Sequence, residues 1–305
     1  MEKSVGKAGK RHADIHLLDA WRIVYSAPDI TVAIIDGGFV LDHPDLQGEY
    51  VREKAYSFLT LDHKLEPVTS TIETHGNLVA GIIGANGMNN IGITGISRQS
   101  RLIPIEAIPN EGEETDENVA AAITYAVRQG ARAINCSFGK ETTSDVVKNA
   151  IAMARDHGVI IVAGAGNDKR NIDKKPLWPA SYSQTFDNVI AVAATDRDDK
   201  LWDDSNYGTT VEIAAPGSEI MSTAMIGMEN SIRADYMTTS GTSMAAPHVT
   251  GVVALMLELN PSLKPAEIKR MLMESADRIP SLKGKVKSGG RLNAVKAVLL
   301  AHPLP

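Results

Sequence analysis

Four polar residues of this sequence stand where their side chains could take part in one reaction. Asp36 ends the apolar run TVAIID, His75 opens the apolar stretch HGNLVAGIIG, and Ser243 opens another, SMAAPHVTG. Asn167 follows the run VIIVAGAG. A serine hydroxyl becomes a nucleophile when an imidazole removes its proton, and the imidazole needs an acid that fixes its tautomer. Together these residue types predict acyl transfer through a covalent serine intermediate.

Each residue alone also has an ordinary structural explanation. An aspartate before Gly37 and Gly38 is a common turn former, and a serine at the start of a helix is a common cap. A single histidine at such a position is often a cap or a packed ring. The combination favours the reaction, because all three lie at the end of an element and can project into one cleft.

The neighbours of Ser243 suit a nucleophile, because small residues let a polypeptide approach the hydroxyl. They are Gly241, Thr242, Ala245 and Ala246. The start of a helix also offers backbone N–H groups to a developing oxyanion, and the amide of Asn167 is a second candidate donor. Pro247 is expected in the first turns of this helix, where its missing N–H costs little.

A sheet must hold these residues in place. Short runs rich in valine and isoleucine alternate with longer amphipathic stretches, which is typical of an α/β fold with helices on both faces of a mostly parallel sheet. Strands are expected at 30–36, 101–108, 131–138, 158–166 and 188–195. Helices are expected at 77–84, 117–130, 144–158, 265–278 and 291–301, besides the helix of Ser243. Asp36 and Asn167 then lie at the carboxyl edge of the sheet, where sites in such folds collect.

Composition indicates one main domain. A chain of 305 residues with 43% hydrophobic residues can bury one sizeable core, and no internal repeat or long linker divides it. We expect one domain over residues 17–305 and a polar arm over residues 1–16. A single cysteine, Cys136, excludes an internal disulfide framework. The longest apolar stretch, around GVVALML, is shorter than the roughly 20 residues that span a bilayer, so no transmembrane helix is expected.

The charge balance bears on partners. The net charge of −6 comes from 31 basic and 37 acidic residues spread along the chain. This balance argues against a general binder of nucleic acid or of anionic membranes. We expect polypeptide partners and a monomer. The first sixteen residues contain no apolar segment of the secretory type. If Met1 is the native start, the expected compartment is the cytoplasm, and the alternative is a secreted mature form without its signal and prosegment.

The sequence resembles the subtilisin-like serine proteases, the S8 peptidases. The blocks VAIIDGGFVLDHPDL, THGNLVAGIIGA, VAGAGND and SGTSMAAPHVTG are similar to that family's Asp, His, oxyanion-Asn and Ser blocks, in the family's order. The spacings between the blocks also suit the family. The likeness continues through WPASYS, NVIAVAATD and IAAPG and so covers most of the chain.

The resemblance implies a subtilisin-like, three-layer α/β/α fold and a serine endopeptidase with an Asp-His-Ser triad. It implies that Ser243 attacks, that His75 acts as base and then as acid, and that Asp36 orients His75. It assigns the oxyanion hole to Asn167 and the backbone N–H of Ser243, and it places an extended substrate against residues 108–112 and 137–139, like an added strand. The residues expected to bind substrate are Ile108, Asn110, Gly112, Ser137, Phe138, Gly139, Gly164, Gly166, Asp168 and Thr242.

Three places depart from the family pattern. Gly37 stands where Ser or Thr usually follows the aspartate, and Gly76-Asn77-Leu78 stands where Gly-Thr-His usually follows the histidine. The loop NGMNNIGITG is one residue shorter than the family's calcium-binding loop, although Asp45 matches a calcium ligand. No cofactor is expected for the chemistry, and a structural calcium ion is left open. The resemblance also implies a cis bond between Trp178 and Pro179.

Other interpretations are weaker. A non-catalytic relative that only binds peptides is disfavoured because all four residues are intact. In a nucleotide-binding protein Gly164 and Gly166 would begin G-x-G-x-x-G, but Lys169 occupies the third position and no G-x-x-x-x-G-K-[ST] loop occurs. A metal hydrolase is disfavoured because H-E-x-x-H is missing and HADIH lies in the polar arm.

An acidic run predicts substrate preference. It consists of Glu111, Glu113, Glu114, Asp116 and Glu117. In the family the matching loop borders the clefts for the second and fourth residues before the cut, and Asp168 lies near the pocket for the residue at the cut. These acids predict that Lys or Arg is favoured at one of these subsites. The alternative is that acids before a helix only stabilise its positive end.

Overall fold

The computed structural model describes residues 9–69, 74–109, 114–228 and 231–302. Four residues that the sequence analysis assigned to substrate binding or to the acidic run lie outside these ranges. They are Asn110, Glu111, Gly112 and Glu113. The strands are β1 (Thr31–Asp36), β2 (Tyr56–Ser57), β3 (Arg101–Glu106), β4 (Ala133–Cys136), β5 (Ile160–Gly164), β6 (Val189–Thr195), β7 (Ile213–Pro216), β8 (Ile220–Met228), β9 (Ser231–Thr239), β10 (Asp277–Arg278) and β11 (Gly290–Arg291). The α-helices are α1 (Leu17–Ala20), α2 (His75–Gly84), α3 (Asp116–Arg128), α4 (Asp145–Asp156), α5 (Thr242–Leu259), α6 (Pro265–Ser275) and α7 (Ala294–Ala301).

Nine strands form one sheet, which confirms the expected α/β fold. Their order is β10-β11-β7-β6-β5-β4-β1-β3-β2, and all neighbours are parallel except β10 and β11. The chain therefore leaves β1 in one direction toward β3 and in the other toward β4 to β7. Crevices of such sheets open at the carboxyl ends of the strands where the order reverses, which here are β1 and β4.

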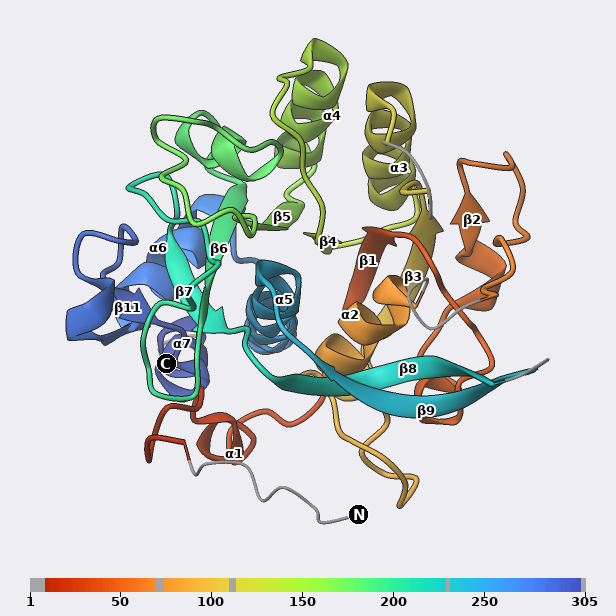
Figure 1. The fold of residues 1–305 in the computed structure, drawn as a ribbon, viewed down its shortest axis with the longest axis horizontal. Coiled ribbons are helices and arrows are strands. Elements are labelled where there is room, and N and C mark those ends of the chain that lie inside the picture. Colours follow the sequence, from red (N-terminus) through yellow and green to blue (C-terminus); the bar gives the residue numbers. More distant parts are fainter. Residues whose placement is uncertain (1–8, 70–73, 110–113, 229–230, 303–305) are drawn as a thin grey trace.

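Alternating side chains of the strands bury two separate cores. In β1, Val32 and Ile34 pack with α2, α5 and α7, whereas Ala33 and Ile35 pack with α3 and α4. Figure 1 shows α3 and α4 on one side of the sheet and α2 and α5 on the other. Because both faces are covered, the strands read as continuous apolar runs. The result is the expected three-layer arrangement.

The helix starts follow the sequence closely. Thr115 caps α3, since its hydroxyl accepts a hydrogen bond from Asn118 N at 3.2 Å. Ser144 caps α4 in the same way. Gly158 adopts a φ of 72° just after α4, a conformation that glycine adopts at little cost. The last helix begins at Ala294 rather than at 291, because Asn293 is its cap.

The antiparallel pair of β8 and β9 was not expected from the sequence. Figure 1 shows this pair as a long ribbon that crosses α2 and extends past the body of the molecule. Ser222 Oγ donates to Leu78 O at 2.6 Å, and Thr223 Oγ1 donates to Asn77 O at 2.7 Å. A Cβ atom at Gly81 would lie 2.3 Å from Thr223 Oγ1, so the strand fits against α2 only because this position is glycine. The hairpin thus braces the helix that begins with His75.

Part of the predicted polar arm contacts the domain. Lys10 N donates to Arg197 O at 2.9 Å, and Ala294 N donates to Ile15 O at 2.7 Å. The side chain of Ile15 is buried. Within the described ranges, α5 alone is long and apolar enough to cross a membrane, and 78% of it is buried inside the protein. A buried core helix explains that composition.

Candidate active site

Asp36 and His75 meet at the carboxyl edge of the sheet. Asp36 is the last residue of β1 and is buried, and His75 is the first residue of α2. His75 Nδ1 lies 2.8 Å from Asp36 Oδ1, which also accepts a hydrogen bond from Gly37 N at 2.8 Å. A carboxylate only accepts, so Nδ1 carries the proton and Nε2 is left as the basic nitrogen. This is the arrangement that a general base requires.

The pKa of His75 reflects two opposing effects. Burial disfavours the charged ring, whereas the negative charge of Asp36 and the hydrogen bond to it favour that form. The charge and the hydrogen bond of Asp36 together outweigh burial, so the pKa of His75 is raised above its usual value of 6.5. His75 is therefore well suited to hold a proton taken from a nucleophile.

Two contacts join the loop after Asp36 to the start of α2. Gly76 N donates to Gly37 O at 2.7 Å, and a Cβ atom at Gly76 would lie 2.6 Å from the ring of Phe39. The buried Asn77 accepts a hydrogen bond from Val40 N at 2.8 Å through Oδ1. Asn77 departs from the family pattern in sequence, and in the structure it fixes the loop that carries Asp36.

Ser243 is the second residue of α5 and lies at the same edge. Its Oγ donates to Ser137 O at 3.1 Å, and no hydrogen bond joins Ser243 to His75 within the described part of the chain. The hydroxyl must therefore release Ser137 O before it can donate to His75. Catalytic hydrogen bonds commonly form only when substrate is bound.

The expectation for Pro247 is wrong in one respect. Pro247 is the sixth residue of α5, beyond the four N–H groups that lack partners at any helix start. Its missing N–H therefore leaves the carbonyl of Ser243 without a helical partner. That carbonyl accepts a hydrogen bond from Ser137 Oγ at 3.0 Å instead. Ser137, expected only to bind substrate, also completes the helix of the nucleophile.

Asn167 lies beside the start of α5, as the sequence predicted. Its Oδ1 accepts hydrogen bonds from Thr242 N at 2.9 Å and from Thr242 Oγ1 at 3.0 Å. Thr242 Oγ1 in turn accepts from Gly166 N at 3.0 Å. These contacts fix which end of the amide faces Thr242, so Nδ2 is the end left to donate elsewhere. Asn167 Nδ2 and the N–H of Ser243 can therefore serve one oxyanion.

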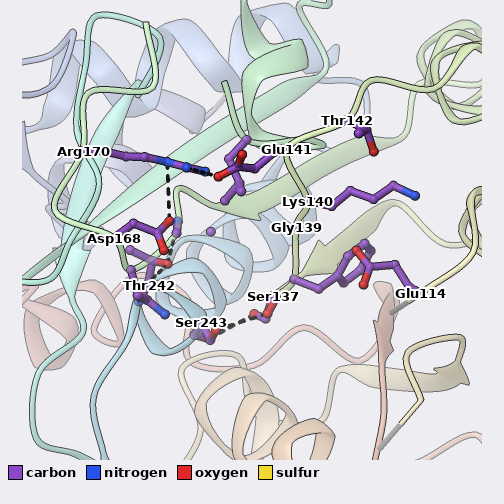
Figure 2. Close-up of a pocket in the computed structure, with 15 residues that line it drawn as sticks. Glu114, Ser137, Gly139, Lys140, Glu141, Thr142, Asp168, Arg170, Thr242 and Ser243 are labelled. Carbon is purple, nitrogen blue, oxygen red and sulfur yellow. Dashed lines mark hydrogen bonds and ion pairs between the residues drawn. The ribbon is translucent and has the colours of Figure 1, made fainter. Parts of the chain in front are cut away.

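A cavity of about 580 Å³ lies beside Ser243 (Figure 2). Its lining includes seven of the ten residues predicted to bind substrate, together with Ser243 and Asn167 of the predicted catalytic set. The seven are Ser137, Phe138, Gly139, Gly164, Gly166, Asp168 and Thr242. Ile108 is not in the lining, but its N–H lies 3.4 Å from Asp36 O. The cavity thus joins the nucleophile to segments that follow β4 and β5.

Sequence reasoning missed other residues of this cavity, including Arg170 and Leu177. A Cβ atom at Gly139 would lie 3.1 Å from Leu177 Cδ2, and one at Gly166 would lie 2.5 Å from it, so Leu177 contacts both walls. Leu177 directly precedes WPASYS, a block that resembles the corresponding block of the family. This position in the sequence was the signal that could have identified Leu177. The bond between Trp178 and Pro179 in that block is cis, which confirms the expectation.

Charged side chains occupy the end of the cavity away from Ser243. Arg170 forms an ion pair with Glu141, and its Nε lies 3.5 Å from Asp168 Oδ2. Figure 2 shows Arg170 pointing toward Glu141, across the cavity from Ser243. Glu114 also lines the cavity. The cavity lining thus contains three acids, Glu114, Glu141 and Asp168, and one arginine. Its lysine, Lys140, forms an ion pair with an acid of α3.

That acid is Asp116, which has a structural role. Burial would raise its pKa, but the hydrogen bonds from Lys140 and Ser144 and the charge of Lys140 lower it. Asp116 therefore supports the segment after β4 instead of facing substrate. This role of Asp116 differs both from a direct substrate contact and from stabilisation of the helix end alone.

Asp45, the residue that matches a calcium ligand, is surrounded by hydrogen-bond donors. Its Oδ1 accepts from Asn89 Nδ2 at 2.9 Å, and its Oδ2 accepts from Ile93 N at 2.8 Å and from Tyr236 Oη at 3.3 Å. Burial and the charge of Asp45 raise the pKa of Tyr236 to about 12, so the phenol keeps its proton. Calcium is bound by six to eight oxygens, and this set of N–H and O–H donors does not fit a cation at Asp45.

The other oxygen of Asp36 leads to a prediction at Gly37. Asp36 Oδ2 is buried and has no hydrogen-bond partner among the described residues. Gly37 is not among the residues with a left-handed φ, so a serine is compatible with its backbone. We expect Gly37→Ser to leave kcat/KM unchanged or to raise it, because the new hydroxyl can hold the carboxylate.

The matched control for this change is Gly38→Ser. Gly38 has a φ of 70°, which strains a serine and lowers the melting temperature. A large loss of kcat/KM in Gly37→Ser at an unchanged melting temperature would instead show that Gly37 is needed for its backbone conformation.

Comparisons with known proteins agree with this geometry. The family model described as "Subtilase family" matches residues 27–295. The thermophilic serine proteinase of Bacillus sp. (strain AK1) is 37% identical over 92% of this chain and 64% of its own length. Thermitase of Thermoactinomyces vulgaris is 36% identical over 92% of this chain and 91% of its own length.

A solved structure, a protease from Pseudoalteromonas arctica, superposes with a TM-score of 0.81 at 26% identity, covering 98% of this chain and 96% of its own. The chain spans only 54% of the length of a further relative, halolysin of Haloferax mediterranei, at 35% identity. Because the family model matches most of the residues and relatives above 30% identity cover most of the chain, this protein belongs to the subtilase family, the S8 peptidases.

Proposed function

We propose that this chain is a serine endopeptidase that hydrolyses polypeptides through an acyl-enzyme. The observation that carries the proposal is the 2.8 Å hydrogen bond between His75 Nδ1 and Asp36 Oδ1 at the sheet edge where Ser243 begins a helix. Membership of the subtilase family supports the same activity.

The reaction begins when the hydroxyl of Ser243 leaves Ser137 O and donates to His75 Nε2. Ser243 Oγ then attacks the carbonyl carbon of the peptide bond, and His75 takes the proton. Asp36 stabilises the charged ring. Asn167 Nδ2 and the N–H of Ser243 donate to the oxygen that becomes negative.

The second half of the reaction returns the enzyme to its starting state. His75 gives its proton to the leaving amine, and the peptide bond breaks. A water molecule then attacks the acyl carbon while His75 takes its proton, the bond from this carbon to Ser243 Oγ breaks, and His75 returns the proton to Ser243 Oγ. Every proton is carried by residues of this chain, so we propose that no metal or cofactor is required for the chemistry.

The substrate is proposed to lie extended along residues 137–139, with 108–112 on its other side. By resemblance to the family, the substrate would pair with these segments as an added strand. The side chain at the cut then enters the cavity beside Ser243, where Leu177 spans the space between Gly139 and Gly166.

A fluorophosphonate probe tests the proposal directly. The probe reacts with an activated serine, and peptide mapping identifies the labelled residue. We expect one label, on Ser243, and none in a His75→Ala variant, because the hydroxyl is then no longer activated. Labelling of another residue, or none in the folded wild-type protein, would overturn the proposed mechanism.

We also propose that Lys or Arg is favoured at one subsite near the acidic run. Glu114, Glu141 and Asp168 all line the cavity, and Arg170 offsets only part of their charge. In a Glu111→Gln/Glu113→Gln/Glu114→Gln variant we expect the preference for basic residues to weaken. In the wild type it should also fade at high salt, because exposed charges are screened over about 10 Å at 0.1 M.

A peptide library profiled at low and high salt measures this preference. The control is Glu117→Gln, which removes an exposed acid from the first turn of α3, away from the cavity lining. The control should keep the wild-type profile. Identical profiles for wild type and the triple variant at both salt concentrations would show that the acidic run acts only on the helix.

A further inference from the structure

One buried side chain holds the loop on which Asn167 lies. Asn206 follows β6 in the sequence and has none of its surface exposed. Its Oδ1 accepts from Asp168 N at 3.0 Å and from Arg170 N at 3.0 Å. Its Nδ2 donates to Ala165 O at 2.9 Å and to Asp168 Oδ2 at 3.1 Å. The two donors and two acceptor positions of the amide are all used.

The backbone of Asn206 adds a fifth contact to the same loop. Asn206 N donates to Gly166 O at 2.8 Å. Gly166 has a φ of 97°, and a Cβ atom there would lie 2.4 Å from Asn206 Nδ2. The glycine therefore allows the amide to lie directly against the loop backbone. The residues before and after Asn167 are both bound to Asn206.

We propose that Asn206 is a positioning residue for the oxyanion donor Asn167. Thr242 fixes the end of the Asn167 side chain, and Asn206 fixes the backbone on both sides of it. An oxyanion donor is effective only within about 2.7–3.1 Å of the developing charge, and a shift of about 1 Å can cost about 10²-fold in rate. This inference rests on the proposed function, in which Asn167 stabilises the oxyanion.

The inference sets an upper limit on the effect. Losing an oxyanion donor of this kind costs about 10² to 10³ in kcat, a value known from the corresponding asparagine of subtilisin. A residue that acts only through Asn167 cannot cost more. For Asn206→Ala we expect a loss of kcat of about 10- to 100-fold, measured with a substrate that has a small residue at the cut so that changes at Asp168 matter little.

A purely structural role would give a different pattern, and a double-mutant cycle separates the two. If Asn206 acts through Asn167, adding Asn206→Ala to Asn167→Ala should lower kcat less than about threefold further. If Asn206 only supports the fold, its effect on kcat should be the same in both backgrounds. The loss of melting temperature caused by Asn206→Ala should be similar in both backgrounds.

Asn188 provides the matched control. It is equally buried, and its Nδ2 donates to Ile151 O at 3.2 Å and to Val159 O at 3.1 Å, away from the cavity. Asn188→Ala should lower the melting temperature while kcat stays within about threefold of the wild type. Asn206→Ser, whose hydroxyl can still donate or accept a hydrogen bond, serves if Asn206→Ala does not fold. It should give a smaller loss of kcat that again disappears in the Asn167→Ala background.

Three outcomes would overturn the inference. Asn206→Ala and Asn206→Ser could match Asn188→Ala in kcat, or their losses could persist in full in the Asn167→Ala background. Either result, with a clear loss in Asn167→Ala itself, rejects the role of Asn206 and leaves the proposed function standing. An unchanged kcat in Asn167→Ala would reject the oxyanion role of Asn167 as well.

Discussion

Ser243→Ala is expected to lower kcat for peptide hydrolysis by about 10⁶ and to leave the chain folded; the magnitude is the one known for the corresponding change in subtilisin. The hydroxyl of Ser243 donates a hydrogen bond to Ser137 O in the resting protein. Alanine is a good helix former at this position of α5. His75→Ala should be equally severe, because the hydroxyl is a poor nucleophile without its base.

Hydrolysis of a chromogenic peptide, together with a melting curve, measures this effect. Ser240→Ala is the matched control: Ser240 is exposed, and its Oγ accepts a hydrogen bond from Glu219 N at 2.8 Å. It should retain most of the activity. Substantial hydrolysis by purified Ser243→Ala that contains no fluorophosphonate-reactive contaminant would contradict the proposed mechanism.

Asp36→Asn is expected to lower kcat by about 10⁴, the size known for this change in another protease with the same triad. The amide of the new asparagine can donate a hydrogen bond to His75 Nδ1. Nδ1 would then be the accepting nitrogen, and the proton of the ring would lie on Nε2. A ring in that tautomer cannot take the proton of Ser243. The loss arises although the size of the side chain is unchanged.

The pH profile of the same variant gives an independent check. Asp36 raises the pKa of His75, and the base must be neutral, so in the wild type kcat/KM should rise with pH through a value above 6.5. Without the carboxylate the pKa falls, and the acidic limb should move to lower pH. Asp42→Asn removes an exposed charge six residues further along the chain, one that is paired with Arg52, and should leave the limb in place. If the acidic limb of the profile lay at the same pH in Asp36→Asn and in the wild type, the pairing of Asp36 with His75 would be contradicted.

The central strands and the pairing of Asp36 with His75 were predictable because local signals marked them. Continuous apolar runs indicate strands buried on both faces, and the polar residue at the end of each run must lie at the sheet edge. The hairpin of β8 and β9 lacked such signals. Its stability against α2 depends on Ser222 and Thr223, which bond to backbone groups about 145 residues away.

Several residues of the site could not be predicted for the same reason, because their partners are distant in the sequence. Arg170 and Leu177 carry no motif, and their importance follows from the segments they meet across the cavity. Asn206 looks like an ordinary loop asparagine, because its partners are 36 to 41 residues earlier in the chain. Ser137 could be placed by resemblance, but its bond to the carbonyl left open by Pro247 could not.

The path of α5 through the core determines when the chain can become active. Fourteen of its eighteen residues are buried, and they pack on strands formed much earlier in the sequence. Ser243 therefore reaches His75 only after the sheet and the helices on both sides of it have closed around α5. Contacts of such long sequence separation form slowly. A chain still being synthesised, or one only partly folded, therefore has no assembled triad, and the site that we propose for hydrolysis exists only in the compact protein.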